Sequence, residues 1–232
     1  MEVIWEGLVK AFWLLVERDP EVVRVTFLSL QVSGVATLLS LGIGIPVGTA
    51  LALTQFRGRQ LVVSMVNTGM GMPPVVVGLF VTIMLWRNGP LGELRLLFTP
   101  SAMVLAQTVI AAPMVTGVTL AAMGSLNPRL RLQILALGAT RWQLLWLLVR
   151  ETRLLLLAAV MAGFGAVISE VGASMMVGGN ILGQTRVLTT ATVMESSKGN
   201  FDVAIALGII LLLMVYAINL ILTYAQQRRR PM

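Results

Sequence analysis

Residues 126–143 read LNPRLRLQILALGATRWQ, and this stretch predicts two helices joined by a sharp turn. Asn127 is a favourable N-cap, and Pro128 suits the first helical position. Gly138 is placed to end the first helix, because glycine adopts a left-handed conformation without steric cost. Thr140 and Gln143 have the spacing of a capping box, which predicts that a second helix begins here. By itself the pattern is also that of an ordinary connector at a membrane surface.

Long uncharged stretches flank this helix pair on both sides. A membrane-spanning helix needs roughly 20 mostly apolar residues, and residues 25–56, 60–86, 96–128 and 203–227 contain no Asp, Glu, Lys or Arg. A fifth stretch, 154–185, is interrupted only by Glu170. The sequence therefore predicts an all-α membrane protein with five transmembrane helices, over about 27–54, 61–86, 101–124, 150–176 and 203–225.

The overall composition supports the same class. Hydrophobic residues make up 57% of the chain and charged residues 12%, whereas soluble domains carry about 25% charged residues. The mean hydropathy is +0.88. So few charges cannot cover a water-facing surface without large exposed apolar patches, and disordered chains are poor in apolar residues. A soluble globular domain and a disordered chain are therefore excluded.

The first segment, residues 1–20, is amphipathic, and its apolar run is too short to span a bilayer. On a helix with 3.6 residues per turn, its charged side chains fall on one side and its large apolar side chains on the other. The charged set is Glu2, Glu6, Lys10 and Glu17, and the apolar set is Ile4, Trp5, Leu8, Phe12, Leu15 and Val16. Such a helix is typical of the membrane interface, so lipid is an expected partner. Asp19-Pro20 is expected to break the chain before the first span.

The charges of the connecting segments predict the orientation in the cell membrane. With five spans, one set of connections carries ten cations and one acid, and the opposite set carries seven cations and eight acids. The basic set is Arg57, Arg59, Arg129, Arg131, Arg141, Arg150, Arg153 and Arg228, Arg229 and Arg230. Because cytoplasmic loops are rich in Lys and Arg, the N-terminus is predicted outside and the tail, 227–232, inside. Topology thus explains the net charge of +7 without a nucleic-acid partner.

The chain has no cysteine and no histidine. This composition removes disulfides, thiolate nucleophiles, the commonest metal ligand and the usual general base near neutral pH. The sequence also lacks a Gly-x-x-x-x-Gly-Lys-(Ser/Thr) phosphate-binding loop. No catalytic residue, metal site or cofactor is therefore predicted, and a membrane-embedded enzyme is the weakest of the function classes.

The helix pair at 126–142 resembles the coupling loop of the permease subunits of bacterial ABC importers. That family carries Glu-Ala-Ala, three residues and Gly in this loop; Gly138 and the following Ala139-Thr140-Arg141-Trp142 match, whereas Leu132, Gln133 and Ile134 replace Glu-Ala-Ala. The resemblance implies a type I ABC importer permease fold over about residues 22–226, with ATP bound by a separate pair of ATPase subunits. The residues expected to contact the ATPase are Asn127, Arg129, Gln133, Ala136, Gly138, Ala139, Thr140 and Arg141.

A second stretch narrows the family. The runs Glu170-Val171-Gly172-Ala173, Val177-Gly178-Gly179-Asn180-Ile181 and Thr185-Arg186-Val187-Leu188-Thr189-Thr190-Ala191 are similar to the sulfate, molybdate and tungstate permeases, and most like the tungstate branch. The resemblance implies a path for a tetrahedral oxyanion, tungstate first and molybdate or sulfate as alternatives. It also implies delivery by an extracytoplasmic binding protein. Five helices leave a one-sided path, so two copies are expected to pair around it.

An oxyanion path needs hydrogen-bond donors and little negative charge. Freed backbone N–H groups and hydroxyl side chains after the fourth span supply such donors, in the way that helix ends and nests bind anions. Loop residues that merely cap helices give the same pattern. The residues assigned to the path and its outer gate are Glu170, Gly172, Gly178, Gly179, Asn180, Thr185, Arg186 and Thr189.

Glu170 is the one acid well inside a predicted span. As a ligand it would repel an anion, so we expect it to pair with a cation or to accept backbone hydrogen bonds that brace the broken end of the fourth span. Gating is the second interpretation. A stand-alone secondary transporter or channel is the alternative from another class, but it would couple protons through intramembrane acids or histidines, and only Glu170 is available.

Overall fold

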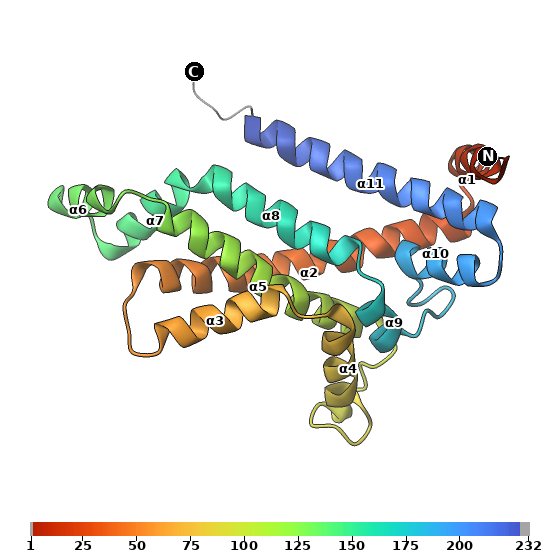
Figure 1. Cartoon of the computed structure of the whole chain (residues 1–232), viewed down its shortest axis with the longest axis horizontal. Coiled ribbons are helices and arrows are strands. Elements are labelled where there is room, and N and C mark those ends of the chain that lie inside the picture. The colour runs from red at the N-terminus through yellow and green to blue at the C-terminus, as the bar shows by residue number, and fades with distance from the viewer. Residues whose placement is uncertain (1, 228–232) are drawn as a thin grey trace.

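The computed structural model describes residues 2–227, apart from the side chains of Glu2, Val3 and Ala225, and this part of the chain is all-α (Figure 1). Within residues 2–227, three helices are long and apolar enough to cross a membrane: α2 (Pro20–Leu53), α5 (Pro100–Gly124) and α11 (Phe201–Gln227). The shorter helices are α1 (Glu2–Val16), α3 (Arg59–Met70), α4 (Pro74–Leu85), α6 (Pro128–Ala136), α7 (Arg141–Glu151), α8 (Arg153–Ile168), α9 (Gly172–Gly178) and α10 (Leu188–Ser197).

The first, third and fifth predicted spans correspond to α2, α5 and α11. α2 begins earlier than predicted, because Asp19 caps it. The Asp19 carboxylate accepts the N–H groups of Glu21 and Val22, each at 3.0 Å, and Pro20 takes the first helical position. The break expected at Asp19-Pro20 is therefore the point where α1 ends and α2 begins.

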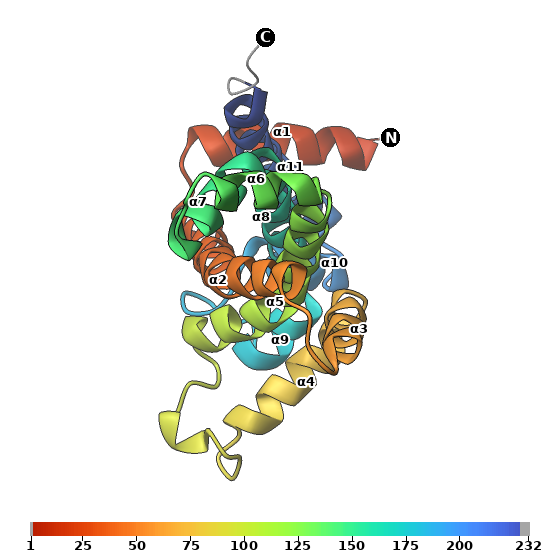
Figure 2. The same ribbon diagram turned by 90° about the vertical axis from the view of Figure 1, so that its left-hand side faces the viewer.

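The second predicted span, 61–86, is not one helix, which corrects the sequence prediction. α3 and α4 meet at a bend of 103° across residues 71–73. Pro73 and Pro74 lack the N–H groups that would continue a helix. Gly69 brings the end of α3 against α5, since a Cβ there would lie 2.8 Å from Pro113. α4 consequently projects from the bundle, as Figure 2 shows from the side.

The fourth predicted span, 150–176, is also divided. α7 and α8 are bent by 69° at Thr152, whose hydroxyl donates to the Leu148 carbonyl oxygen at 2.9 Å. α8 has only 16 residues and ends before Glu170, and α9 follows as a separate short helix. Five crossings are reached only if each bent pair, α3 with α4 and α7 with α8, is counted as one span.

Close packing of α2 against α5 forms the centre of the bundle. Gly44 and Gly48 of α2 lie against α5, where a Cβ on Gly48 would come within 2.6 Å of the Thr116 carbonyl oxygen. Small residues allow helix backbones to approach in this way in a lipid environment. The buried hydroxyl of Thr37 bonds to the Ser33 carbonyl oxygen of its own helix at 2.7 Å, so it needs no partner across the interface.

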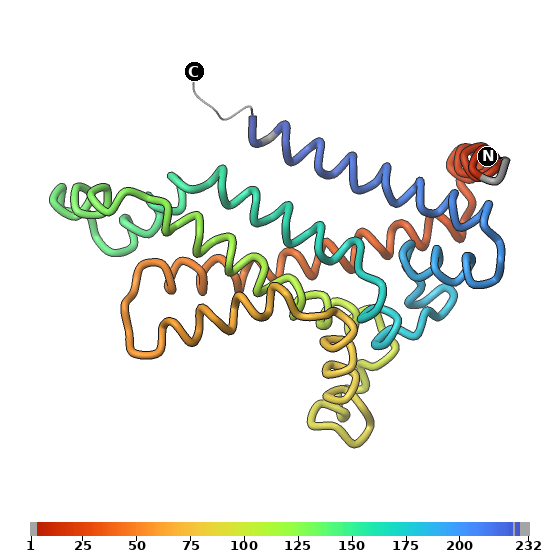
Figure 3. Tube along the Cα trace, viewed as in Figure 1, coloured from red at the N-terminus to blue at the C-terminus, as the bar shows by residue number. Residues whose placement is uncertain are grey.

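The two ends of the bundle carry different segments, which the trace in Figure 3 follows. The α2–α3 connection, α6 and α7 lie at one end, and α1, α10 and the start of α11 lie at the other. Within residues 2–227, the segments that hold the cations assigned to the cytoplasm therefore share one end. The basic residues 228–230 lie outside the described part of the chain.

Candidate functional site

The α6–α7 pair has the local structure that the sequence predicts. The Asn127 side chain accepts the Arg129 N–H at 2.9 Å and caps α6. Gly138 follows α6 with a φ of +81°, in the left-handed region. The Thr140 hydroxyl accepts the Gln143 N–H at 3.3 Å, and the Gln143 side chain accepts the Thr140 N–H at 2.8 Å. The predicted helix, glycine turn and capping box are confirmed.

The inner side of this pair is anchored to the end of the bundle. Leu130 and Ile134 of α6 pack against the buried Leu144, Leu148 and Met123. α6 is also tied to the end of α2, because the Arg131 guanidinium donates to the Leu53 carbonyl oxygen at 3.1 Å. The pair is therefore held in place as a projecting unit.

The outer side of the pair is exposed and apolar at its tip. Leu137 is 87% exposed and Trp142 81%, and Leu132 and Leu135 are exposed beside them. A contiguous exposed apolar patch of this kind is typical of an interaction surface. The sequence contains a signal for these four residues that the predicted site did not use: leucines recur around all sides of α6, so a nine-residue helix cannot bury them on one face.

The predicted ATPase contacts belong to the same helix pair. Ala139 is half-buried, and the remaining seven are exposed: Asn127, Arg129, Gln133, Ala136, Gly138, Thr140 and Arg141. Among them, Asn127, Gly138 and Thr140 shape the backbone, and Arg129 and Arg141 add positive charge to the pair. The exposed part of the pair thus combines apolar side chains with basic ones.

Glu170 sits at the break between α8 and α9 and is only 7% exposed. Its carboxylate Oε1 accepts the Ala173 N–H at 2.8 Å and so satisfies the start of α9. Its backbone carbonyl oxygen accepts the Thr189 hydroxyl at 3.0 Å. The ion pairs found among residues 2–227 do not include Glu170. The carboxylate was expected to pair with a cation or to accept backbone hydrogen bonds, and a backbone hydrogen bond is observed.

The loop from Gly178 to Thr185 is closed by a single buried hydroxyl. Thr185 Oγ1 donates to the Gly178 carbonyl oxygen at 2.6 Å and accepts the Ile181 N–H at 2.9 Å. Gly179 and Asn180 both have positive φ, at +70° and 51°, which allows the tight reversal. Asn180 Oδ1 is buried without a hydrogen-bond partner among the described residues.

The hydroxyl groups of this segment have acceptors within the chain. Thr185 and Thr189 were expected to offer donors to an anion, but both are buried and donate to carbonyl oxygens of the chain itself. Thr190 and Thr192 likewise donate to the Val187 and Leu188 carbonyl oxygens. A threonine hydroxyl carries one proton, so each of these donors is already in use. In the structure these hydrogen bonds stabilise the conformation of the α9–α10 segment.

The glycines of this segment allow α9 to pack closely. A Cβ on Gly172 would lie 2.6 Å from Val75 of α4, and a Cβ on Gly178 would lie 2.9 Å from the Met103 sulfur of α5. α9 thus lies between α4 and α5, beside a buried apolar cluster that includes Val77, Met103 and Val177. Of the predicted path residues, Glu170, Gly172, Gly178, Gly179 and Thr189 therefore lie together, in α9 or beside it.

Arg186 does not lie with these residues. Its guanidinium pairs with Glu21 of α2 at 3.0 Å and lines a pocket of about 270 Å³ between α1, α2, α10 and α11. Glu195 also lines this pocket, and hydrogen bonds from the Asn200 and Lys198 side chains lower the pKa of its carboxyl group. Arg186 therefore belongs to a separate polar region near α1. No group of three or more metal-ligating side chains occurs among residues 2–227.

Comparison with known proteins shows that the chain is similar to permease subunits of transporters. A family model described as binding-protein-dependent transport system inner membrane component matches residues 44–231. The chain is 45% identical over 202 residues to a probable anion ABC transporter permease protein of Haloferax volcanii, which covers 85% of this chain and 87% of that protein. It is 40% identical over 227 residues to the tungstate uptake system permease protein TupB of Peptoclostridium acidaminophilum, covering 98% of this chain and 100% of the relative.

The fold has a counterpart among solved structures. A structure of the MetNI methionine ABC transporter in an inward facing conformation superimposes with a TM-score of 0.76 at 21% sequence identity. The match covers 92% of this chain and 99% of that chain. At this level of identity the likeness concerns the arrangement of helices, which agrees with the expected permease fold.

Proposed function

Because the chain belongs to the family of binding-protein-dependent transport system inner membrane components, we propose that it forms the membrane path through which an ABC importer takes up tungstate. The choice of tungstate as the substrate rests on the similarity to a tungstate uptake permease along nearly the whole chain. The chain is a multi-pass transport subunit rather than an enzyme. Molybdate and sulfate are the alternatives within the same class.

The ATPase docks on the exposed tip of the α6–α7 pair. The support is the apolar surface of Leu137 and Trp142, held on a pair of capped helices that are anchored by Leu130 and Ile134. Because the chain has no phosphate-binding loop of its own, ATP binds a separate pair of ATPase subunits and this chain takes no cofactor. Movement of the ATPase is transmitted through α6 and α7 to α8.

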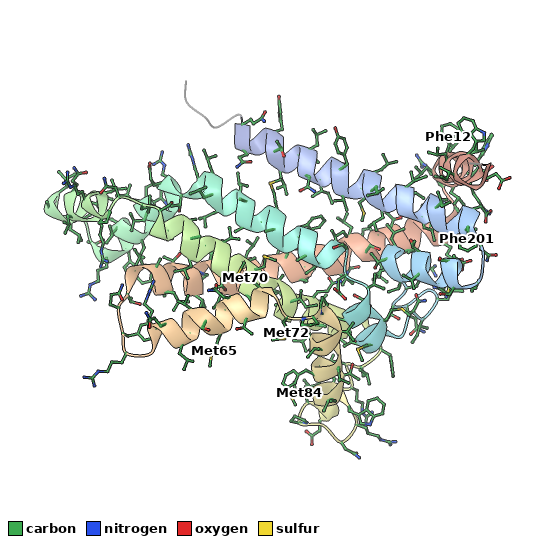
Figure 4. The ribbon with its side chains drawn as sticks, viewed as in Figure 1. Phe12, Met65, Met70, Met72, Met84 and Phe201 are labelled. Carbon is green, nitrogen blue, oxygen red and sulfur yellow. The ribbon has the colours of Figure 1, made fainter. Side chains whose placement is uncertain are left out.

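A second copy of the chain covers α3 and α4. α3 has no buried residue, and Met65, Met70 and Met72 are exposed along α3 and its bend to α4 (Figure 4). The outward face of α4 is apolar, with Val76, Leu79, Phe80 and Ile83 exposed. Pairing of two copies across this face encloses a path that five crossings in one copy leave open.

The N-terminus lies outside and the C-terminus in the cytoplasm. α6, α7 and the α2–α3 connection share one end with most of the arginines, which supports this orientation. An extracytoplasmic binding protein delivers the oxyanion at the opposite end. Residues 171–192 form the outer gate there, with Asn180 as its polar turn and Glu170 as the brace of α9.

The function is tested by reconstituting the chain with its ATPase and binding protein in vesicles and measuring tungstate uptake. We expect uptake that requires ATP and is inhibited least by sulfate. Preferred uptake of molybdate or sulfate would reassign the substrate within the class. Uptake driven by an ion gradient, without ATP or the ATPase, would instead support a secondary transporter. Reporter fusions at Arg95 and after Arg230 should report opposite sides of the membrane.

A further inference from the structure

The N-terminal helix α1 has three distinct faces, one more than the sequence pattern indicates. Gly7 and Ala11 are buried and Leu14 is half-buried, and together they form a narrow strip at helical spacing. Glu6, Lys10 and Glu17 form a charged strip beside it. The rest of the helix is apolar and exposed: Ile4, Trp5, Leu8, Val9, Phe12, Trp13, Leu15 and Val16.

The narrow strip fixes α1 on the start of α11. A Cβ on Gly7 would lie 2.5 Å from Ile205 Cγ2, so only glycine allows this approach. The Lys10 ammonium pairs with the Asp202 carboxylate at 2.6 Å. α1 packs chiefly against α11, and no described helix covers its large apolar face.

The orientation of α1 relative to α11 indicates what that face meets. In Figure 1 α1 is seen end-on while α11 lies across the view, and in Figure 2 the two exchange, so the helices are nearly perpendicular. If α11 crosses the bilayer, α1 lies parallel to the membrane surface at the end of that span. Figure 4 shows that Phe12 points away from α11 at this level.

We propose that α1 is a lipid-binding helix whose apolar face inserts among the acyl chains of one leaflet, with Trp5 and Trp13 at the boundary with the headgroups. Tryptophan is favoured at this depth, because its ring is apolar and its N–H is polar. Further along α11, Leu212, Leu213 and Tyr216 are exposed as well, as expected for a helix that faces lipid. The proposal requires only that α11 spans the membrane, and it is independent of the transported anion.

The charges near α1 determine the type of lipid contact. Among the described groups of this region without an ion pair, Glu6, Glu17 and Asp19 outnumber Arg18 and Arg24, since Lys10 is paired with Asp202 and Glu21 with Arg186. An anionic lipid surface would therefore repel this region rather than attract it. Binding should come from burial of apolar side chains and should not depend on negatively charged headgroups.

The test uses the absence of native cysteine. Neighbouring single substitutions Val16→Cys and Glu17→Cys lie on different faces, as do Phe12→Cys and Glu6→Cys. Each full-length variant is labelled with a fluorophore and reconstituted with its ATPase and binding protein in phosphatidylcholine vesicles, or in equal parts phosphatidylcholine and phosphatidylglycerol. Quenching by nitroxide-labelled lipid and by aqueous iodide is then measured, in variants that retain ATP-dependent uptake.

We expect probes at 12 and 16 to be quenched several-fold more by lipid nitroxide than probes at 6 and 17, and the order to reverse with iodide. Both vesicle types should give the same result. Equal iodide quenching at all four positions would overturn the proposal. So would protection of positions 12 and 16 from both quenchers, which would mean that a protein covers the face. Lipid quenching seen only with phosphatidylglycerol would contradict the apolar mode of binding.

Discussion

The hydroxyl of Thr189 donates a hydrogen bond of 3.0 Å to the backbone carbonyl oxygen of Glu170, and this bond joins α10 to the break between α8 and α9. The carboxylate of the same Glu170 accepts the Ala173 N–H at 2.8 Å. One buried residue therefore holds three helices, α8, α9 and α10, through two hydrogen bonds. A short helix at this depth needs such partners, because lipid offers none to its free backbone groups.

Replacing Thr189 by valine keeps the shape of the side chain and removes the donor. The Glu170 carbonyl oxygen then stays buried without this partner, which costs about 1–3 kcal/mol. We expect the unfolding temperature of the purified complex in detergent to fall. The matched control is Thr192→Val, since the Leu188 carbonyl oxygen bonded by Thr192 keeps its helical N–H. Equal effects of the two substitutions would contradict the assigned bond.

The carboxylate of Glu170 can be tested by separating its charge from its acceptor oxygen. Glu170→Gln retains an oxygen that can accept the Ala173 N–H, so uptake and complex stability should stay close to those of the parent chain. Glu170→Leu leaves that N–H buried without an acceptor, which costs about 1–3 kcal/mol of stability. Uptake and complex stability should therefore both fall. If Glu170→Gln assembles normally but loses uptake, the charge itself acts in gating.

Packing between α2 and α5 should be sensitive to single methyl groups. Gly48→Ala places a carbon 2.6 Å from the Thr116 carbonyl oxygen, whereas a Cβ on Gly42 of the same helix has no atom within 4 Å. Overpacking of this kind costs about 1–3 kcal/mol. We expect Gly48→Ala to lower the unfolding temperature and Gly42→Ala to leave it unchanged. A similar loss in both variants would show that glycine is needed for another reason.

Local chemistry explains why some elements could be predicted from the sequence. Asn127, Gly138 and Thr140 define helix ends by bonds within four residues, and the structure shows each of them as expected. The long uncharged stretches likewise predict α2, α5 and α11. In both cases the necessary information lies within one segment.

The bends depend on contacts that a hydropathy pattern does not contain. Residues 61–86 are uncharged throughout, yet Pro73 and Pro74 divide them. At the same bend, Gly69 lets the end of α3 pack closely against Pro113 of α5. The use of the threonine hydroxyls was equally hidden, because the Thr185 and Thr189 acceptors, Gly178 and Glu170, are set by the tertiary fold.

The exposed tip of α6–α7 should matter for coupling and not for folding. Leu137 and Trp142 contribute little to the described core, so the double substitution Leu137→Gln with Trp142→Gln should leave the membrane level and unfolding temperature near those of the parent chain. ATP-dependent uptake and recovery of the ATPase on co-purification should fall at least several-fold. Leu94→Gln, an exposed leucine outside this pair, is the control. Undiminished ATPase recovery would place the docking surface elsewhere.

Gly138 tests whether the turn itself transmits movement. Its φ of +81° is strained for a side chain with a Cβ, but no atom lies within 4 Å of that position, so any effect of substitution is conformational rather than steric. Gly138→Val should cost about 1–3 kcal/mol at the turn and shift α6 relative to α7. Uptake and stimulated ATP hydrolysis should both fall while the protein still reaches the membrane. Gly138→Asn should restore much of the activity, because asparagine tolerates the left-handed conformation better than valine. Full coupling in the valine variant, or equal loss in both variants, would show that the turn geometry does not control coupling.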